Sequence, residues 1–403
     1  MKKILFVSYN YFPPVYSGKL IISGRRLQDL DPNKFTVKVF TAGLKGLAPK
    51  NKNGSVQIYR SPYIGSGKIS GRLNVVSFWI WSFFKVIWEK NFTGLHFDEV
   101  GYFSIPLFDR LGYRLAWKHF TLLAKIARKR GALTIFEHAI SDSKDHFAPD
   151  PIKTQFLNQL SQIVCVSDAL YEATRKVYPD QTMGITYGIE DDIFSPLSDE
   201  KRNRVRAANG ADPSVIILGF VGLTVRRKGF DLICDIFPEI CEEFPKSVLW
   251  VVGPKNHTES NHIHDDEVAR YQAVLEPVKS HVKFFGNIPE RKRLAELMAA
   301  MDIFVFPTRQ EGFGLAPVEA MACGVPPIIA RIPGVTDLAN IEGITGLYIE
   351  PDNREQLNQA VRALILDQEL RQRMGKAARQ RVEEKFSWQS HVKKWEDLYD
   401  HKG

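Results

Sequence analysis

Short apolar runs alternate with longer amphipathic stretches along the 403-residue chain, a pattern typical of βα repeats around parallel sheets. A first series predicts strands at 4–8, 36–41, 56–59, 99–103, 133–137, 163–167 and 183–187. A second series predicts strands at 216–221, 248–252, 282–285, 303–306, 327–330 and 346–349. Helices are expected at 20–30, 168–177, 230–244, 291–300, 317–321 and 354–367. Each series is long enough for one doubly wound α/β domain.

A polar segment with two prolines, 191–213, separates the two series. We therefore expect a Rossmann-like N-terminal domain at 1–193, a linker at 194–214 and a second Rossmann-like domain at 215–385. The last residues, 386–403, carry an apolar stripe (Trp388, Trp395, Leu398) and are expected to form a helix that returns to the first domain. Ligands of such sheets bind beyond the carboxyl ends of the strands, so a site is expected in a cleft between the domains.

Charge is unevenly distributed along the chain. Residues 1–130 hold 22 Lys and Arg against 6 Asp and Glu, a net +16, whereas the remainder holds 32 against 40, a net −8. This asymmetry favours an anionic partner for the first part, either membrane lipid or an acidic acceptor. Nucleic acid is not expected, because no nucleic-acid-binding motif is present. The apolar segment 75–88 is too short to span a membrane and is either a buried helix or a helix lying on a membrane face.

Two further features concern the compartment. The apolar run that follows the N-terminal lysines is only about five residues long, which is shorter than a signal peptide requires and favours a buried first strand. The four cysteines are scattered and form no C-x-x-C pair. That spacing argues against a disulfide framework or a zinc site and favours a reducing compartment.

The most informative motif follows the strand predicted at 303–306. A glycine-bearing loop, Glu311-Gly312-Phe313-Gly314, leads directly into a helix that contains Glu319. Glycines let backbone approach a ligand closely, and the unpaired N–H groups at a helix N-terminus favour anions. This arrangement predicts a diphosphate cradle. The two carboxylates, eight residues apart, are suited to hold hydroxyls on either side of it, one on a hexose and one on a ribose.

Residues 302–324 (DIFVFPTRQEGFGLAPVEAMACG) resemble the signature of glycosyltransferase family four, the retaining GT-B glycosyltransferases. The resemblance extends to 221–231, 281–289, 333–338, 343–353 and 386–399, and so covers nearly the whole chain. It implies a GT-B fold of two facing Rossmann-like domains, with a nucleotide-sugar as donor substrate.

The resemblance also implies roles for individual residues. His138, Lys228 and Glu311 are expected to be catalytic, with Lys228 neutralising the departing diphosphate. The residues expected to bind the donor are Gly18, Gly222, Arg227, Lys228, Phe285, Gly286, Glu311, Gly312, Phe313, Gly314, Leu315 and Glu319. Three positions depart from the family pattern: Ser17 replaces a glycine, Leu223 an arginine and Tyr187 an asparagine. Arg226 or Arg227 is a candidate substitute for the missing arginine.

The sequence therefore predicts a cytoplasmic hexosyltransferase, peripheral on the membrane, that uses a UDP- or GDP-sugar and a glycan or lipid-linked acceptor. The predicted setting is the synthesis of cell-surface polysaccharide or glycolipid. No cofactor or metal is expected: no D-x-D carboxylate pair stands at the end of a predicted strand, and the segment with His257, His262 and His264 is interpreted as a solvated loop. Two alternatives remain, a nucleotide-sugar epimerase of the same architecture and a sugar-nucleotide-binding protein with impaired catalysis.

Overall fold

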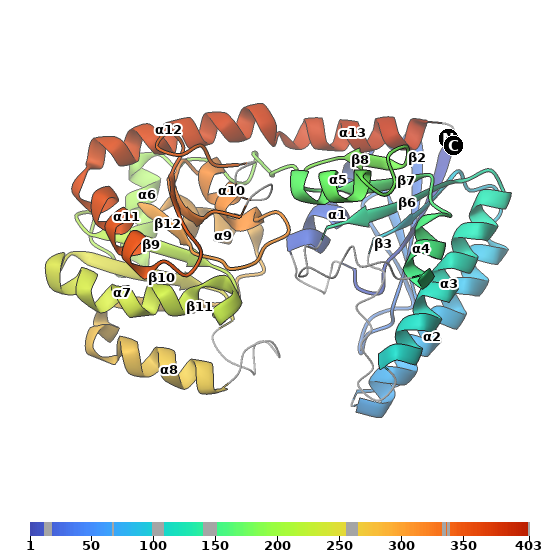
Figure 1. Cartoon of the computed structure of the whole chain (residues 1–403), viewed down its shortest axis with the longest axis horizontal. Coiled ribbons are helices and arrows are strands. Elements are labelled where there is room, and N and C mark those ends of the chain that lie inside the picture. Colours follow the sequence, from blue (N-terminus) through green and yellow to red (C-terminus); the bar gives the residue numbers. More distant parts are fainter. Residues whose placement is uncertain are drawn as a thin grey trace. The chain divides into compact units, whose positions relative to one another are not determined.

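The structure, a computed structural model, describes residues 1–11, 18–66, 68–98, 109–139, 151–254, 265–332, 336 and 339–401. The chain forms two compact units, Met1–Thr186 with Gln389–Gly403 (unit 1) and Tyr187–Trp388 (unit 2). Each unit is built on one parallel sheet with helices (Figure 1), which confirms the predicted α/β fold class. The segment 194–214, predicted to be a linker, lies inside unit 2 and contains helix α6 (Asp199–Ala208).

The sheet of unit 1 has the strand order β3-β4-β2-β1-β5-β6-β7-β8 and is parallel except for the pairing of β3 with β4. Its strands are β1 (Lys2–Val7), β2 (Phe35–Thr41), β3 (Lys50–Asn53), β4 (Val56–Arg60), β5 (Gly94–Phe97), β6 (Leu133–His138), β7 (Gln162–Cys165) and β8 (Thr182–Gly184). The central strands β1, β5 and β6 are largely buried, as expected for parallel strands that are covered on both faces.

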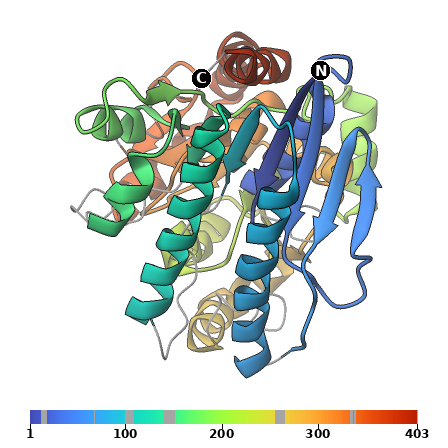
Figure 2. The same ribbon diagram turned by 90° about the vertical axis from the view of Figure 1, so that its right-hand side faces the viewer.

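Among the residues that the structure describes, six helices belong wholly or mostly to unit 1. They are α1 (Gly18–Asp29), α2 (Lys68–Trp88), α3 (Asp109–Lys129), α4 (Pro151–Leu157), α5 (Asp168–Arg175) and α13 (Trp388–Asp400). The long helices α2 and α3 pack side by side against the sheet (Figures 1 and 2). Among the described residues, no helix is both long enough and apolar enough to cross a bilayer. The four cysteines are buried and unbonded.

The sheet of unit 2 is parallel throughout, in the order β11-β10-β9-β12-β13-β14. Its strands are β9 (Ile216–Val221), β10 (Ser247–Val252), β11 (Val282–Gly286), β12 (Ile303–Phe306), β13 (Pro327–Ala330) and β14 (Leu347–Ile349). Besides α6, its helices are η1 (Arg226–Lys228), α7 (Phe230–Glu243), α8 (Asp265–Leu275), η2 (Glu276–His281), α9 (Arg291–Ala299), α10 (Leu315–Ala322), α11 (Arg354–Leu366) and α12 (Gln368–Lys385).

Alternate residues of these strands form the main core of unit 2. Phe220, Val251 and Val305 lie on one face of the sheet and pack with the apolar sides of α7 and α11. Helix ends are fixed by side-chain caps: Asn353 accepts from the backbone N–H of Gln356 at 2.9 Å, and Asp367 accepts from that of Leu370 at 2.8 Å. The result is a rigid sheet whose carboxyl-end loops carry most of the predicted donor-binding residues.

Two strands differ from the sequence prediction. Strand β5, at Gly94–Phe97 between β1 and β6, was not predicted. The strand expected at 99–103 lies outside the described residues. The edge strand β3 was missed, because its sequence KNKN has no apolar residue. Edge strands tolerate such exposed lysines, which also discourage pairing with other chains.

Candidate functional site

Glycines end three neighbouring strands of unit 2. Gly222, Gly253 and Gly286 follow or close β9, β10 and β11, and all have positive φ. The N–H of Gly222 donates to the carbonyl of Val252 at 2.9 Å, and that of Gly253 donates to the carbonyl of Gly286 at 2.8 Å. A Cβ on Gly253 would lie 2.0 Å from the Gly222 oxygen. Backbone therefore packs against backbone along this edge, with two predicted donor-binding residues, Gly222 and Gly286, in the seam.

Lys228 and Glu311 form the centre of the candidate site. The Lys228 ammonium is ion-paired with the Glu311 carboxylate, and only 15% and 17% of these side chains are exposed. The ammonium also lies 5.4 Å from the centre of the Phe306 ring, a cation–π distance. Lys228 ends η1, after β9, and Glu311 follows β12, the neighbour of β9 in the sheet. Two of the three predicted catalytic residues are thus brought into contact from positions 83 residues apart.

Gly229 makes this approach possible. It has φ 74°, and a Cβ on it would lie 1.9 Å from the carbonyl oxygen of Pro307. The loop after β12 is therefore in direct backbone contact with the turn that carries Lys228. Two hydrogen bonds hold this contact, and both are accepted by the Arg227 carbonyl. The N–H of Arg309 donates at 2.9 Å and the Thr308 hydroxyl donates at 3.2 Å.

Arg309 is a residue that the sequence analysis did not single out. Its guanidinium donates to both oxygens of Asp231, at 2.7 and 2.8 Å, and its Nε donates to Asp352 at 2.6 Å. It also donates to the carbonyl of Arg226. Burial lowers the pKa of Arg309, but the two carboxylates outweigh this and raise it above its usual value. Arg309 thus ties the β12 loop to the start of α7, which fixes the Lys228–Glu311 geometry.

The N-terminus of α10 supplies the anion-binding geometry that the motif predicts. Gly314 caps the helix in a left-handed conformation (φ 85°) and offers no side-chain cap to the first turn. The N–H of Gly312 donates to the Glu311 carboxylate at 3.2 Å. Gly312 and Leu315 are half-buried, and the partial positive charge of the helix end lies beside the Lys228–Glu311 pair in the chain.

Glu319, expected to meet a ribose hydroxyl, has a protein partner. Its carboxylate is 4% exposed and accepts from Arg291 at 2.8 Å. Arg291 also binds Glu190, through Nε at 2.7 Å. Burial lowers the pKa of Arg291, but Glu319 and Glu190 outweigh it and raise the value. This buried triad fixes α10 against α9 and against the segment 187–190.

Two predicted donor-binding aromatic residues differ in their surroundings. Phe313 is 4% exposed and packs edge-on against Tyr187 and Phe386, with ring centres 5.2 and 5.7 Å apart. Its side chain belongs to the core, so a donor contact at this position would use the backbone N–H. Phe285 is half-buried near the end of β11 and contacts Trp250 edge-on at 5.2 Å. Arg227 is exposed and donates to the Gln310 carbonyl at 3.3 Å, beside Glu311 in the loop.

The remaining predicted site residues lie in unit 1. Gly18 is the exposed first residue of α1, while Tyr16 and Ser17 lie outside the described residues. His138 is the last residue of β6 and is 8% exposed. Its Nδ1 lies 3.5 Å from the Thr174 hydroxyl, at the limit of a hydrogen bond. It therefore sits at the carboxyl end of a parallel strand, where sheets of this kind bind ligands.

Glu137, next to His138, points into the core. Its carboxylate is ion-paired with Arg26 at 2.9 Å, and both side chains are fully buried. Burial favours the protonated form of Glu137, but Arg26 outweighs it and holds its pKa below the ordinary value. The Arg26 guanidinium lies 3.8 Å from the ring centre of Trp395 in α13. This pair attaches the C-terminal helix and is not available to a substrate.

Buried histidines complete the contact with α13. His96 Nδ1 lies 2.7 Å from the Tyr399 hydroxyl, and the His96 ring stacks on Trp395 at 5.0 Å. Burial, helped by Arg26, lowers the pKa of His96 well below its usual value and that of His391 to about 3. Both rings are therefore neutral near pH 7.

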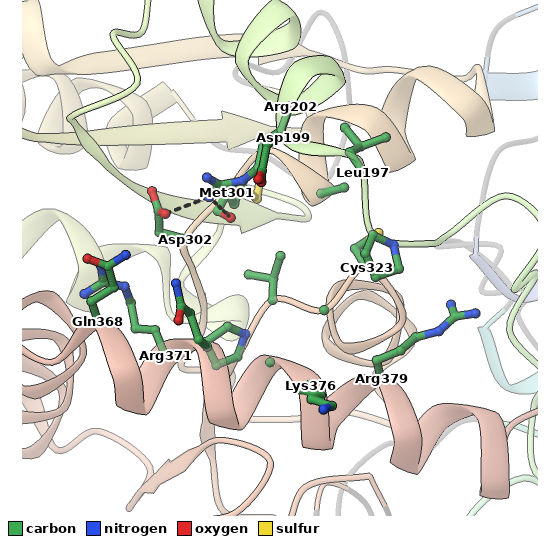
Figure 3. A pocket seen from close by; sticks show the side chains of 17 residues that line it. Leu197, Asp199, Arg202, Met301, Asp302, Cys323, Gln368, Arg371, Lys376 and Arg379 are labelled. Atoms are coloured by element: carbon green, nitrogen blue, oxygen red, sulfur yellow. Dashed lines mark hydrogen bonds and ion pairs between the residues drawn. The ribbon is translucent and has the colours of Figure 1, made fainter.

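A pocket of about 440 Å³ lies elsewhere in unit 2, between α6 and α12 (Figure 3). It contains Met301 and Asp302, which precede β12, so it lies at the amino end of that strand rather than at the carboxyl end. Its arginines already have partners: Arg202 binds Asp302 at 2.7 Å, and Arg379 donates to the carbonyls of Phe194 and Ala322. We interpret this pocket as a structural seam between helices.

Within the part of the chain that the structure describes, no group of three His, Cys, Asp or Glu side chains is placed to hold a metal ion. The histidines at 257, 262 and 264 lie outside those residues. The positive charge of the candidate site comes from Lys228, Arg227 and the N-terminus of α10.

The match to a known family falls on the part of the chain that contains Lys228 and Glu311. Residues 201–381 match the family model described as Glycosyl transferases group 1. The D-inositol 3-phosphate glycosyltransferase of Corynebacterium jeikeium is 31% identical over 217 residues, 53% of this chain and 50% of that protein. The chain thus aligns with about half the length of this relative.

Two solved structures have the fold of the whole chain. The sucrose-phosphate synthase of Thermosynechococcus elongatus has a TM-score of 0.78 at 20% identity, covering 99% of this chain and 98% of that one. Anabaena Alr3699/HepE in complex with UDP and glucose has a TM-score of 0.70 at 18% identity, covering 98% and 99%. At these identities the likeness establishes the two-unit fold alone.

Proposed function

We propose that the chain is a glycosyltransferase of group 1, a retaining hexosyltransferase that uses a UDP- or GDP-sugar. The match of residues 201–381 to that family's model supports this class. The observation that carries the proposal is the Lys228–Glu311 pair beside the N-terminus of α10. A cation and the N–H groups of a helix N-terminus suit a diphosphate, and a carboxylate suits sugar hydroxyls. The related structure that contains UDP and glucose supports this class of donor.

In the proposed reaction, the bond between the anomeric carbon and the diphosphate oxygen breaks, and a bond to the acceptor oxygen forms on the same face. The acceptor proton passes to the departing diphosphate. Lys228 stabilises the charge that develops on the leaving group, and Glu311 holds the hexose in place. His138 contributes a hydrogen bond to the transferred sugar, and Gly18 lets backbone approach it. No enzymic nucleophile is required.

We propose a glycan or lipid-linked hydroxyl as acceptor, in cell-surface polysaccharide or glycolipid synthesis. The support is the charge of the first 130 residues, whose net +16 suits an acidic acceptor or an anionic membrane. The protein would then act at the cytoplasmic face of a membrane as a peripheral enzyme.

A donor screen tests the proposal. Release of UDP or GDP would be measured across a panel of nucleotide-sugars, with and without a lipid extract as acceptor. Lys228→Ala and Glu311→Ala are each expected to lower turnover about 10²- to 10³-fold, the cost of losing one charge-stabilising group. The matched control is Lys201→Ala, because Lys201 is paired with Glu296 at 3.3 Å but is 55% exposed.

The outcomes separate the remaining functions. Nucleotide binding without any sugar transfer or release would leave a binding protein. Conversion of the donor sugar into its epimer would identify an epimerase instead. Either result would refute the proposed transferase.

A further inference from the structure

Helix α2 has an apolar outer face as well as an apolar inner one. Five large apolar side chains recur every three or four residues and therefore share one side of the helix. They are Leu73 (46% exposed), Val76 (40%), Ile80 (56%), Phe84 (44%) and Trp88 (69%). The opposite side, with Phe78, Ser82 and Val86, is fully buried. A helix packed on one face only normally carries polar residues on its outer face, so this stripe calls for an occupant.

Helix α3 extends the same surface. It lies beside α2, with the His119 ring 3.3 Å from the Ser82 hydroxyl and stacked on Trp79. Its own exposed side carries Leu115 (47%) and Leu122 (46%). Exposed cations share that side, at 114, 118, 125 and 129. We call the exposed sides of α2 and α3 together the α2–α3 face (Figure 2).

The charge of these helices is one-sided. Their 42 residues contain nine Lys and Arg and a single acidic residue, Asp109, a net 9 − 1 = +8. The whole chain also has a net charge of +8, so the other 361 residues hold 45 basic and 45 acidic residues and sum to zero. These two helices therefore carry half of the net +16 of the first 130 residues.

A shallow apolar groove of about 360 Å³ opens on this surface. It is lined by Pro62, Ser77, Ile80, Trp81, Phe84, Lys85 and Trp88. The Lys85 ammonium lies 5.6 Å from the centre of the Trp81 ring, so its stem covers apolar surface while its charge remains at the rim. Tryptophan and lysine in this arrangement suit the boundary between acyl chains and headgroups.

We propose that the α2–α3 face docks the protein on an anionic lipid surface, with the α2 stripe inserted at the headgroup boundary and the α3 cations against the headgroups. This inference rests on the proposed function only for its purpose, which is to bring the enzyme to a membrane-bound acceptor. Charge complementarity selects the occupant: a second copy of the chain would bring nine cations against nine. Apolar insertion and cation attraction act together in such interfacial helices.

Co-sedimentation with vesicles tests the docking. The full chain is expected to bind phosphatidylcholine vesicles that contain phosphatidylglycerol, to bind pure phosphatidylcholine weakly, and to be released by high salt. The triple variant Ile80→Ser, Phe84→Ser, Trp88→Ser and the double variant Lys118→Glu, Lys125→Glu are each expected to lower binding at least roughly tenfold. Leu366→Ser is the matched control, because Leu366 is 72% exposed in unit 2.

Three results would overturn the inference: equal binding to neutral and anionic vesicles, wild-type binding by both variants, or no binding at all. A fourth contrary result would come from light scattering: a dimer of the wild-type chain that is lost in the triple variant. The α2 stripe would then bind a second copy of the chain. Unchanged melting temperatures and unchanged donor turnover in solution would show that the variants are folded. Donor turnover without vesicle binding would refute only the docking inference. Vesicle binding without turnover of any donor would refute only the proposed function.

Discussion

The two units use buried charge for different purposes. In unit 2 three buried or half-buried ion pairs lie around the carboxyl-end loops: Lys228 with Glu311, Arg309 with Asp231, and Arg291 with Glu319. A fourth pair, Arg206 with Asp302, lies at the amino end of β12. In unit 1 the fully buried pair, Arg26 with Glu137, lies under the C-terminal helix. Desolvated charges are costly unless they are paired in a fixed geometry. We infer that the three ion pairs around the carboxyl-end loops of unit 2 fix the geometry of the candidate donor site, whereas the central pair of unit 1 attaches α13.

The match to a known family is also confined to one unit. The family model matches residues 201–381, which lie in unit 2. Unit 1 carries the basic α2–α3 face and contributes only Gly18 and His138 to the predicted site. A shared donor chemistry with a variable acceptor side would produce this difference.

The largest expected effect is in unit 1. Arg26→Met leaves Glu137 charged and buried, and should destabilise unit 1 by about 3–5 kcal/mol and loosen α13. Thermal unfolding followed by tryptophan fluorescence measures this, because five of the seven tryptophans belong to unit 1. The control is Arg270→Met, which removes an exposed pair with Asp235 and should cost about 0–1 kcal/mol. Similar losses in both variants would mean that burial of the pair is unimportant.

The next effect is confined to the site in unit 2. Gly229→Ala combines left-handed strain of about 1–2 kcal/mol with overpacking of about 1–3 kcal/mol, because its Cβ would meet the Pro307 carbonyl. It should also lower donor turnover by displacing Lys228. Gly343→Ala is matched in φ (72°) but has no neighbour within 4 Å, so it should carry the strain alone and keep full turnover. Equal turnover in the two variants would contradict the role given to this contact.

The smallest effect is a pH dependence that belongs to unit 1. Burial lowers the pKa of His119 to about 4 and that of His391 to about 3, against about 6.5 in an unfolded chain. Between these values the unfolded state binds more protons, so stability falls as the pH drops below about 6.5. From pH 7.5 to 5 each histidine should cost about 2 kcal/mol, since the slope approaches 1.36 kcal/mol per pH unit below the unfolded pKa. Urea unfolding at pH 7.5 and 5 tests this, and a flat stability of unit 1 would refute it.

Much of the architecture follows from local pattern. The runs Ile216–Val221 and Ile303–Phe306 became strands at their predicted bounds, because a short, wholly apolar segment between polar ones is stable only inside a sheet. Strand β3 escaped this reasoning because its four residues are polar and it lies at the edge of the sheet. For the segment 75–88 the sequence left two alternatives, a buried helix and a helix lying on a membrane face. It belongs to α2, which has both an apolar buried face and an apolar exposed face.

The candidate site was predictable only in part. Glu311, Gly314 and Lys228 stand out because a strand, a glycine and a helix follow one another in sequence. Three arginines do not stand out, because no local motif links them to their distant partners. Arg309 lies 78 positions from Asp231, Arg291 lies 101 from Glu190, and Arg26 lies 111 from Glu137. The burial of Glu319 was missed for the same reason, because its partner Arg291 is on another helix.

The most direct test of the account is amide hydrogen exchange with and without UDP or GDP. If unit 2 holds the nucleotide at the carboxyl ends of β9 and β12, the amides of Gly312, Gly314 and Leu315 should gain protection, together with those of 226–229. Lys228→Ala should abolish the gain at the same nucleotide concentration, and Lys201→Ala should not. The account would be contradicted if these amides did not change while protection appeared at the α6–α12 pocket or in unit 1 alone.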